Sequence, residues 1–230
     1  MIDVALLLIF GLVAWNVAAE GAWGAAAVFL SVLFAGLVAM DYFEPLADLL
    51  QSGLGIDWAS RVDFIALVGL FAAGVFGLRY LSEWLVPSFI LVHGRVYDVC
   101  RWGFAVLTGY TTIGFLLTAL HTAPLPRDFL GFTPERNNFF GTLAPDRDWL
   151  GFVQYVSEKS MPSSEEGRIF DGSRFRLPYH ENEIWPTFII RYASRRENFG
   201  TAAVAVAPAA APVPAGGAPH PTQPAGPPGL

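Results

Sequence analysis

Two charged side chains next to an apolar segment are the first candidates for chemistry in this chain. Asp98 and Arg101 are three residues apart, so on a helix they would share one face. A membrane boundary lowers the dielectric around charges and strengthens their attraction. We therefore predict that Asp98 and Arg101 form a functional pair at the mouth of a membrane-spanning helix. The alternative is an ordinary interfacial anchor.

Polar side chains inside apolar segments are the second group of candidates. Asn16 lies in the first apolar segment, and the last one contains four threonines: Thr108, Thr111, Thr112 and Thr118. A threonine hydroxyl in a helix can bond back to the carbonyl of the preceding turn. It can equally line a pathway, because polar residues in membranes tend to face protein interiors. Asn16, Thr111 and Thr112 are therefore candidate functional polar residues.

The residue types give little support to metal or nucleophile chemistry. The chain has one cysteine, Cys100, and four widely separated histidines. A disulfide within the chain, a cysteine-based zinc site and a paired-histidine metal helix are thereby excluded. The net charge of −6 and the lack of a basic stripe argue against nucleic acid as a partner. We predict no catalytic residue, no metal site, no cofactor and no enzymatic activity.

The composition indicates a membrane protein. Hydrophobic residues make up 53% of the chain and charged residues 15%, against about 25% charged in a typical soluble domain. Residues 1–60 contain no lysine or arginine, and residues 201–230 contain no charge at all. The sequence thus divides into a transmembrane domain over 1–121, an aqueous or membrane-surface region over 122–200, and a disordered Ala/Pro-rich tail over 201–230.

Four segments are long and apolar enough to cross a bilayer, which takes about 20 residues in a helix. The first resembles a signal peptide near Glu20, but it has no positive charge at its start and a second apolar segment follows at once. We predict an all-α four-transmembrane-helix bundle with a small mixed C-terminal region. The spans are 2–19, 22–40, 59–85 and 102–120.

Stripes of small residues predict where the helices of this bundle approach one another. Such stripes allow close backbone contact where lipid gives no hydrophobic drive between helices. They serve packing within the chain about as readily as a homo-oligomer. The predicted packing residues are Ser31, Ala35 and Ala39 in the second span, Gly69, Ala73 and Gly77 in the third, and Gly103 and Gly109 in the fourth.

Three further segments carry local signals. Between spans two and three, Glu44-Pro45 predicts the start of a short helix lying in the membrane interface. The segment 148–156 places Trp149, Phe152, Val153 and Val156 on one helical face, which predicts a helix docked on the membrane surface or on the bundle. Segments 167–178 and 185–198 are predicted as extended chain around glycine and proline turns.

The arrangement over residues 1–160 resembles the colicin V production (CvpA) family of bacterial inner-membrane proteins. The resemblance rests on Ile2-Asp3 at the start, a tight first hairpin ending near Gly24, and Asp98-x-x-Arg101 entering a glycine-containing fourth span; Gly103, Gly109 and Pro124 complete the pattern. The chain departs from the family in three places: Glu20 stands alone where basic residues are usual, Tyr110 to Gly114 replaces a frequent Arg-Gly, and residues 162–200 are an addition.

The resemblance implies a non-enzymatic host factor for production or export of the toxin colicin V, with effects on envelope integrity. It implies a multi-pass protein of the bacterial inner membrane with its termini in the periplasm, whereas the arginines alone are balanced between the two faces. The expected partners are the bilayer and a membrane or envelope protein. The alternative function is a small channel or transporter subunit with a threonine-lined fourth helix.

Overall fold

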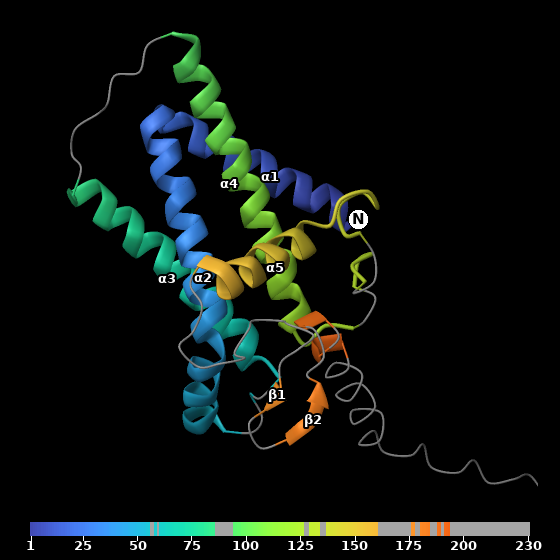
Figure 1. The fold of residues 1–230 in the computed structure, drawn as a ribbon. Helices are drawn as coiled ribbons and strands as arrows, with labels where there is room; N and C mark the ends of the chain where they lie inside the picture. The colour runs from blue at the N-terminus through green and yellow to red at the C-terminus, as the bar shows by residue number, and fades with distance from the viewer. Residues whose placement is uncertain are drawn as a thin grey trace, which may run out of the picture.

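The computed structural model describes residues 1–55, 58, 60–85, 94–126, 129–133, 137–160, 176–177, 180–184, 188–189 and 191–193. Four of its helices are long and apolar enough to cross a membrane, which confirms the predicted all-α bundle and makes the chain a multi-pass membrane protein. They are α1 (Ile2–Ala19), α2 (Gly21–Leu54), α3 (Val62–Leu85) and α4 (Arg95–Thr122) (Figure 1). The predicted tail and the apolar segment after Leu85 lie outside the described residues.

The predicted tight hairpin between the first two helices is confirmed. Glu20 alone separates α1 from α2, and Gly21 adopts a φ of +81°, which side chains rarely allow. A Cβ at Gly21 would also lie 2.9 Å from the Tyr97 hydroxyl of α4. The backbone conformation therefore favours glycine at this turn, and the Tyr97 side chain would have to shift to admit a larger residue.

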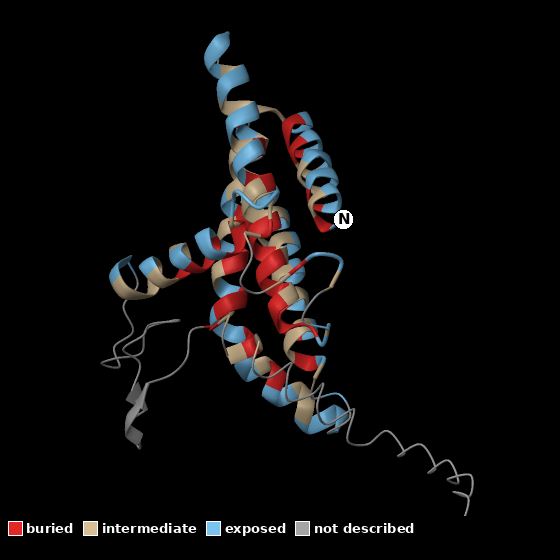
Figure 2. Cartoon of the chain, turned by 90° about the vertical axis from the view of Figure 1, so that its right-hand side faces the viewer, coloured by how far each residue is buried: buried red, intermediate tan, exposed pale blue. Residues whose placement is uncertain are grey.

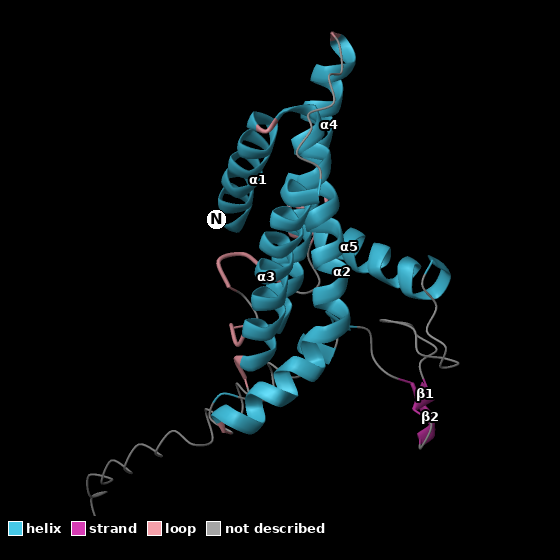
Figure 3. Ribbon diagram, turned by 90° about the vertical axis from the view of Figure 1, so that its left-hand side faces the viewer, coloured by secondary structure: helices cyan, strands magenta, loops and turns pink. Residues whose placement is uncertain are grey.

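The predicted separate interfacial helix after the second span is wrong. α2 continues without a break to Leu54, with Pro45 inside it. Met40, Phe43 and Ala47 keep one buried face along the helix, while Pro45 itself is exposed. The burial on both sides of the proline outweighs the one hydrogen bond that its missing N–H removes. Figure 3 shows α2 bending in its lower half, as expected for a helix with an internal proline.

α4 is the central helix of the bundle and packs against both α1 and α2. Phe10 of α1 covers Gly109, and the ring of Phe29 on α2 lies 5.8 Å from that of Phe104. α3 packs mainly against α2, and its Phe71 stacks on Phe115 with 4.0 Å between ring centroids. Buried residues concentrate where these helices meet, as Figure 2 shows.

A fifth helix, α5 (Pro145–Tyr155), crosses the bundle and continues into a π-helical turn at Val156–Ser160. Trp149 and Val153 are buried and Phe152 and Val156 are half-buried, so the predicted docked helix is confirmed. Two glycines leave space for α5 to pack closely. A Cβ at Gly36 would lie 2.7 Å from the Trp149 ring, and a Cβ at Gly114 would lie 2.6 Å from the Pro145 carbonyl oxygen.

The described part of the C-terminal region is small and mixed. Two short antiparallel strands, β1 (Arg176–Leu177) and β2 (His180–Ile184), form a hairpin. Residues 188–189 and 191–193 are helical, so the prediction of extended chain is wrong there. The Phe188 ring lies 6.3 Å from that of Phe43, and Arg191 pairs with Glu44 of α2. This segment therefore packs against α2 through an aromatic contact and an ion pair.

Candidate functional site

A polar layer closes one end of the bundle. Arg79 of α3 donates to Glu20 at 2.7 Å and to Glu83 at 3.1 Å. Arg101 of α4 donates from Nε to the carbonyl oxygen of Ala18, in the last turn of α1. We call Glu20, Arg79 and Arg101 the Glu20 layer. Its contacts connect the hairpin between α1 and α2 to the other two long helices.

The predicted pair of Asp98 and Arg101 is not formed. Asp98 is exposed, and no ion pair joins these two described side chains. The guanidinium of Arg101 reaches α1 instead, where the carbonyl groups at the helix C-terminus carry partial negative charge and favour a nearby cation. Arg101 also lies 5.7 Å from the centre of the Trp102 ring. The arginine is therefore an anchor between α1 and α4.

Most of the predicted polar side chains of the spans form hydrogen bonds within their own helices. Thr108, Thr112 and Thr118 each donate to the carbonyl four residues earlier, which is the back-bonding interpretation. Asn16 is exposed and donates to the carbonyl of Leu12. Thr111 is half-buried beside them. Asn16 on α1 is exposed, whereas the threonines of α4 are buried or half-buried, and no hydrogen bond joins Asn16 to them among the described residues.

The opposite end of the bundle holds a buried polar contact that the sequence analysis missed. His121 Nε2 of α4 lies 3.0 Å from Asp146 Oδ2 of α5, and both side chains have no exposed surface. The Phe132 ring covers His121 at 4.8 Å between centroids. Ionisable groups are almost never fully buried unless they are paired. The His121–Asp146 pair therefore fixes the start of α5 to the end of α4.

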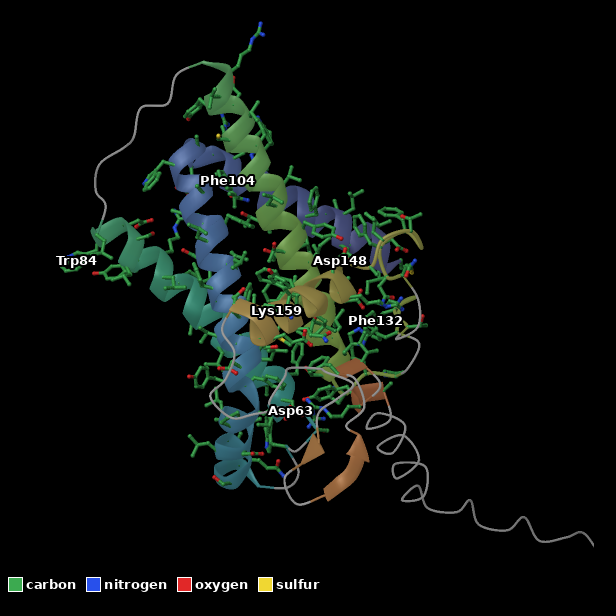
Figure 4. The ribbon with its side chains drawn as sticks, in the orientation of Figure 1. Asp63, Trp84, Phe104, Phe132, Asp148 and Lys159 are labelled. Atoms are coloured by element: carbon green, nitrogen blue, oxygen red, sulfur yellow. The ribbon has the colours of Figure 1, made fainter. Side chains whose placement is uncertain are left out.

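A second acidic residue of α5 makes a parallel contact. The Tyr110 hydroxyl donates to Asp148, which Figure 4 labels at the start of α5. Tyr110 and His121 are about three helical turns apart, so they share one face of α4 with Gly114 between them. That spacing, followed by two acids on the next helix, is the sequence signal that predicts this contact.

Three buried polar atoms of α4 and α5 have no hydrogen-bond partner among the described residues. They are His121 Nδ1, Asp146 Oδ1 and Trp149 Nε1. A buried polar group without a partner costs about 1–3 kcal/mol. Loss of either His121 or Asp146 would leave one more buried polar group without a partner and would lower the stability of the fold.

The predicted packing stripe of α2 is confirmed as a packing surface. Ser31, Ala35 and Ala39 are buried, and Ala35 meets Gly74 of α3, where a Cβ would lie 2.9 Å from the Ala35 Cβ. Gly109 of α4 also packs, against Phe10. The prediction for Gly103 is wrong within this chain, because Gly103 is exposed and a Cβ there would meet nothing within 4 Å.

The predicted stripe of α3 does not pack within the chain either. Gly69, Ala73 and Gly77 are exposed, and a Cβ at either glycine would meet nothing within 4 Å. The inward face of α3 carries Gly74 instead, one residue away from the stripe. The helix thus has glycines on two faces. Because α3 lies at the edge of the bundle, only the face with Gly74 packs against α2.

A ridge of large aromatic side chains runs beside the exposed stripe. Phe76, Tyr80 and Trp84 are 76%, 75% and 72% exposed and recur every fourth residue. Figure 4 shows Trp84 pointing away from the bundle. Of the most apolar 18-residue stretch of α3, only 11% is buried inside the protein, whereas 50% of the corresponding stretch of α4 is buried. We call Gly69, Ala73 and Gly77 with this ridge the outer face of α3.

No family model matches the chain, and neither a curated protein nor a solved structure matches it. The resemblance to the CvpA family therefore rests on the sequence motifs alone.

Proposed function

We propose that this chain is a non-enzymatic membrane scaffold that binds another membrane or envelope protein along the outer face of α3. The observation that supports the proposal is the exposed stripe of Gly69, Ala73 and Gly77. Small residues at this spacing let a second helix approach closely, and the adjacent aromatic ridge supplies a wall for it to pack against. The equivalent stripe of α2 is already covered by α3, which shows how such a surface is used in this bundle.

By its resemblance to the CvpA family, we place this scaffold in the bacterial inner membrane. Its proposed role is to support production or export of colicin V and the integrity of the envelope. Asp3 accepts a hydrogen bond from the Phe140 amide, so the start of α1 and the segment after α4 lie on one side of the bundle. We propose that this side is periplasmic.

The scaffold is tested by photo-cross-linking from the outer face of α3. A benzoyl-phenylalanine at Phe76 replaces one exposed aromatic ring by another and should give an adduct in intact cells. The same probe at Leu8, which is 68% exposed on α1, is the matched control and should give none. Ala73→Leu should abolish the adduct at Phe76 by filling the stripe.

The outcomes of this experiment separate the candidates. An adduct of about twice the mass of the chain identifies a second copy, and any other mass identifies a different partner. Equal adducts at Phe76 and Leu8, or none at either position, contradict the scaffold.

The proposed sidedness is tested with two thiols. Cys100 is the single native cysteine and lies near the Glu20 layer, whereas a cysteine introduced at the exposed Ser160 lies after α5. In spheroplasts a membrane-impermeant maleimide should label Ser160→Cys and leave Cys100 unlabelled until lysis. Protection of Ser160→Cys before lysis, with labelling afterwards, reverses the assignment.

A further inference from the structure

A groove opens between α2 and the end of α5, and no residue of α3 lines it. It has a volume of about 290 Å³. Its apolar part is formed by two side chains of α2 and two from α5 and the π-helical turn: Leu37, Val38, Val153 and Val156. Four aliphatic side chains around an open groove of this size fit a hydrocarbon chain.

The rim of the groove is polar and carries a negative charge. Asp41, Tyr42 and Ser157 complete the lining. The Ser157 hydroxyl already donates to the Gln154 carbonyl, and Tyr42 is 57% exposed. Asp41 is exposed as well. The carboxylate and the phenol ring are therefore the groups that remain open to a ligand at this rim.

The groove lies at the depth where a lipid changes from acyl chain to headgroup. Asp41 is the first charged residue of α2, and the next charged residue toward the N-terminus is Glu20, just before the helix. Along the helix the two are about 31 Å apart, which is about the thickness of a bilayer core. Leu37 and Val38 lie one turn inside that boundary. Trp149 of α5 reaches Gly36, so α5 enters the bilayer by several ångströms, as an interfacial helix does.

The charges of α2 beside the groove favour a cation, and the nearest base of the π-helical turn, Lys159, is exposed and does not line the groove. No residue from 1 to 60 is a lysine or an arginine. Glu44, one turn further along α2, is paired with Arg191, whereas within the described residues no cation pairs with Asp41. An ammonium group beside Asp41 would gain charge-assisted hydrogen bonds to the carboxylate and could also contact the Tyr42 ring.

We propose that this groove binds phosphatidylethanolamine, with its ammonium group on Asp41 and one acyl chain along Val38 and Val153. A primary ammonium has three N–H donors for the carboxylate, and the quaternary group of phosphatidylcholine has none. An anionic phospholipid such as phosphatidylglycerol would place its negative charge against Asp41. The groove therefore selects by headgroup, and it does so independently of the scaffold role of α3.

Native mass spectrometry of the full chain in detergent tests this selection. Titration with each lipid should show phosphatidylethanolamine bound about tenfold more tightly than phosphatidylcholine or phosphatidylglycerol. Asp41→Asn should abolish that preference, so that the three lipids bind with about equal affinity. Asp48→Asn is the matched control, because Asp48 is an exposed acid of the same helix that does not line the groove.

Two results would overturn the proposal. One is equal binding of phosphatidylethanolamine and phosphatidylcholine by the unaltered chain. The other is an unchanged preference in Asp41→Asn when circular dichroism shows native helicity. Val38→Trp, which fills the apolar part of the groove, should lower the binding of all three lipids, and unaltered binding by this variant would place the lipid elsewhere.

Discussion

The small-residue stripes of α2 and α3 have the same spacing and lie in opposite environments. Ala35 and Ala39 of α2 are almost completely buried, whereas Ala73 of α3 is exposed. Spacing determines which residues share a helix face, but it does not determine what lies opposite that face. α2 has neighbours on several sides, and α3 packs mainly against α2. A stripe of small residues therefore predicts that another helix can approach closely, but it does not identify that helix.

The largest effect should come from removing the contact that holds α5 over α2. Asp146→Ala leaves His121 buried without its partner, and breaking a buried pair in this way costs about 3–5 kcal/mol. The measurement is thermal unfolding of the purified chain in detergent. Asp148→Ala removes the exposed acceptor of the Tyr110 hydroxyl and should cost only about 1 kcal/mol.

Equal destabilisation by these two alanine variants would contradict this interpretation of the α4–α5 contact. It would mean that the covering of α2 by α5 depends on apolar contacts such as Trp149 over Gly36 rather than on the buried pair.

Much of the architecture could be predicted from the sequence because its causes are local. Apolar length identified the four spans, Glu20-Gly21 indicated the first hairpin, and helical periodicity placed Trp149 and Val153 on the docked face of α5. Each of these predictions depends on residues that are neighbours along the chain.

The errors concern contacts between segments that are distant along the chain. Pro45 is a helix start in isolation, but Phe43 and Ala47 are buried by other segments and keep α2 continuous. Arg101 has a local candidate partner in Asp98, yet the carbonyl of Ala18 is the better acceptor once α1 and α4 are adjacent. His121 and Asp146 are paired only because α5 folds back over α4.

Leucine substitutions at equivalent positions of the two stripes test the comparison directly. Ala35→Leu should force α2 and α3 apart and cost about 1–3 kcal/mol, because Ala35 contacts the backbone at Gly74. Ala73→Leu adds the same atoms on the outer face and should leave the unfolding temperature in detergent unchanged, while it removes the proposed partner. A comparable loss of stability in Ala73→Leu would show that the outer face of α3 packs within the chain.

A smaller effect distinguishes the inward and outward members of the predicted charged pair. Arg101→Gln weakens the hydrogen bond from α4 to the end of α1 and should cost about 1 kcal/mol. Asp98→Asn changes an exposed side chain and should leave stability unaltered. Unfolding in detergent measures both. If Asp98→Asn proves the more damaging of the two, the anchor role of Arg101 is wrong.

The smallest effect should distinguish the two glycine faces of α3 itself. Gly69→Ala places a methyl group where nothing lies within 4 Å, so the helix gains the usual preference for alanine over glycine, about 0.5–1 kcal/mol. Gly74→Ala would gain the same preference, but its Cβ would lie 2.9 Å from the Ala35 Cβ and 3.3 Å from its Cα. The backbone of α2 cannot move away as a flexible side chain can, so the strain should cancel the gain or reverse it. Unfolding temperatures in detergent should therefore rise slightly for Gly69→Ala and stay level or fall for Gly74→Ala. A rise of equal size in both variants would mean that α2 and α3 are not in close contact at Ala35, and the contrast between the stripes would then disappear.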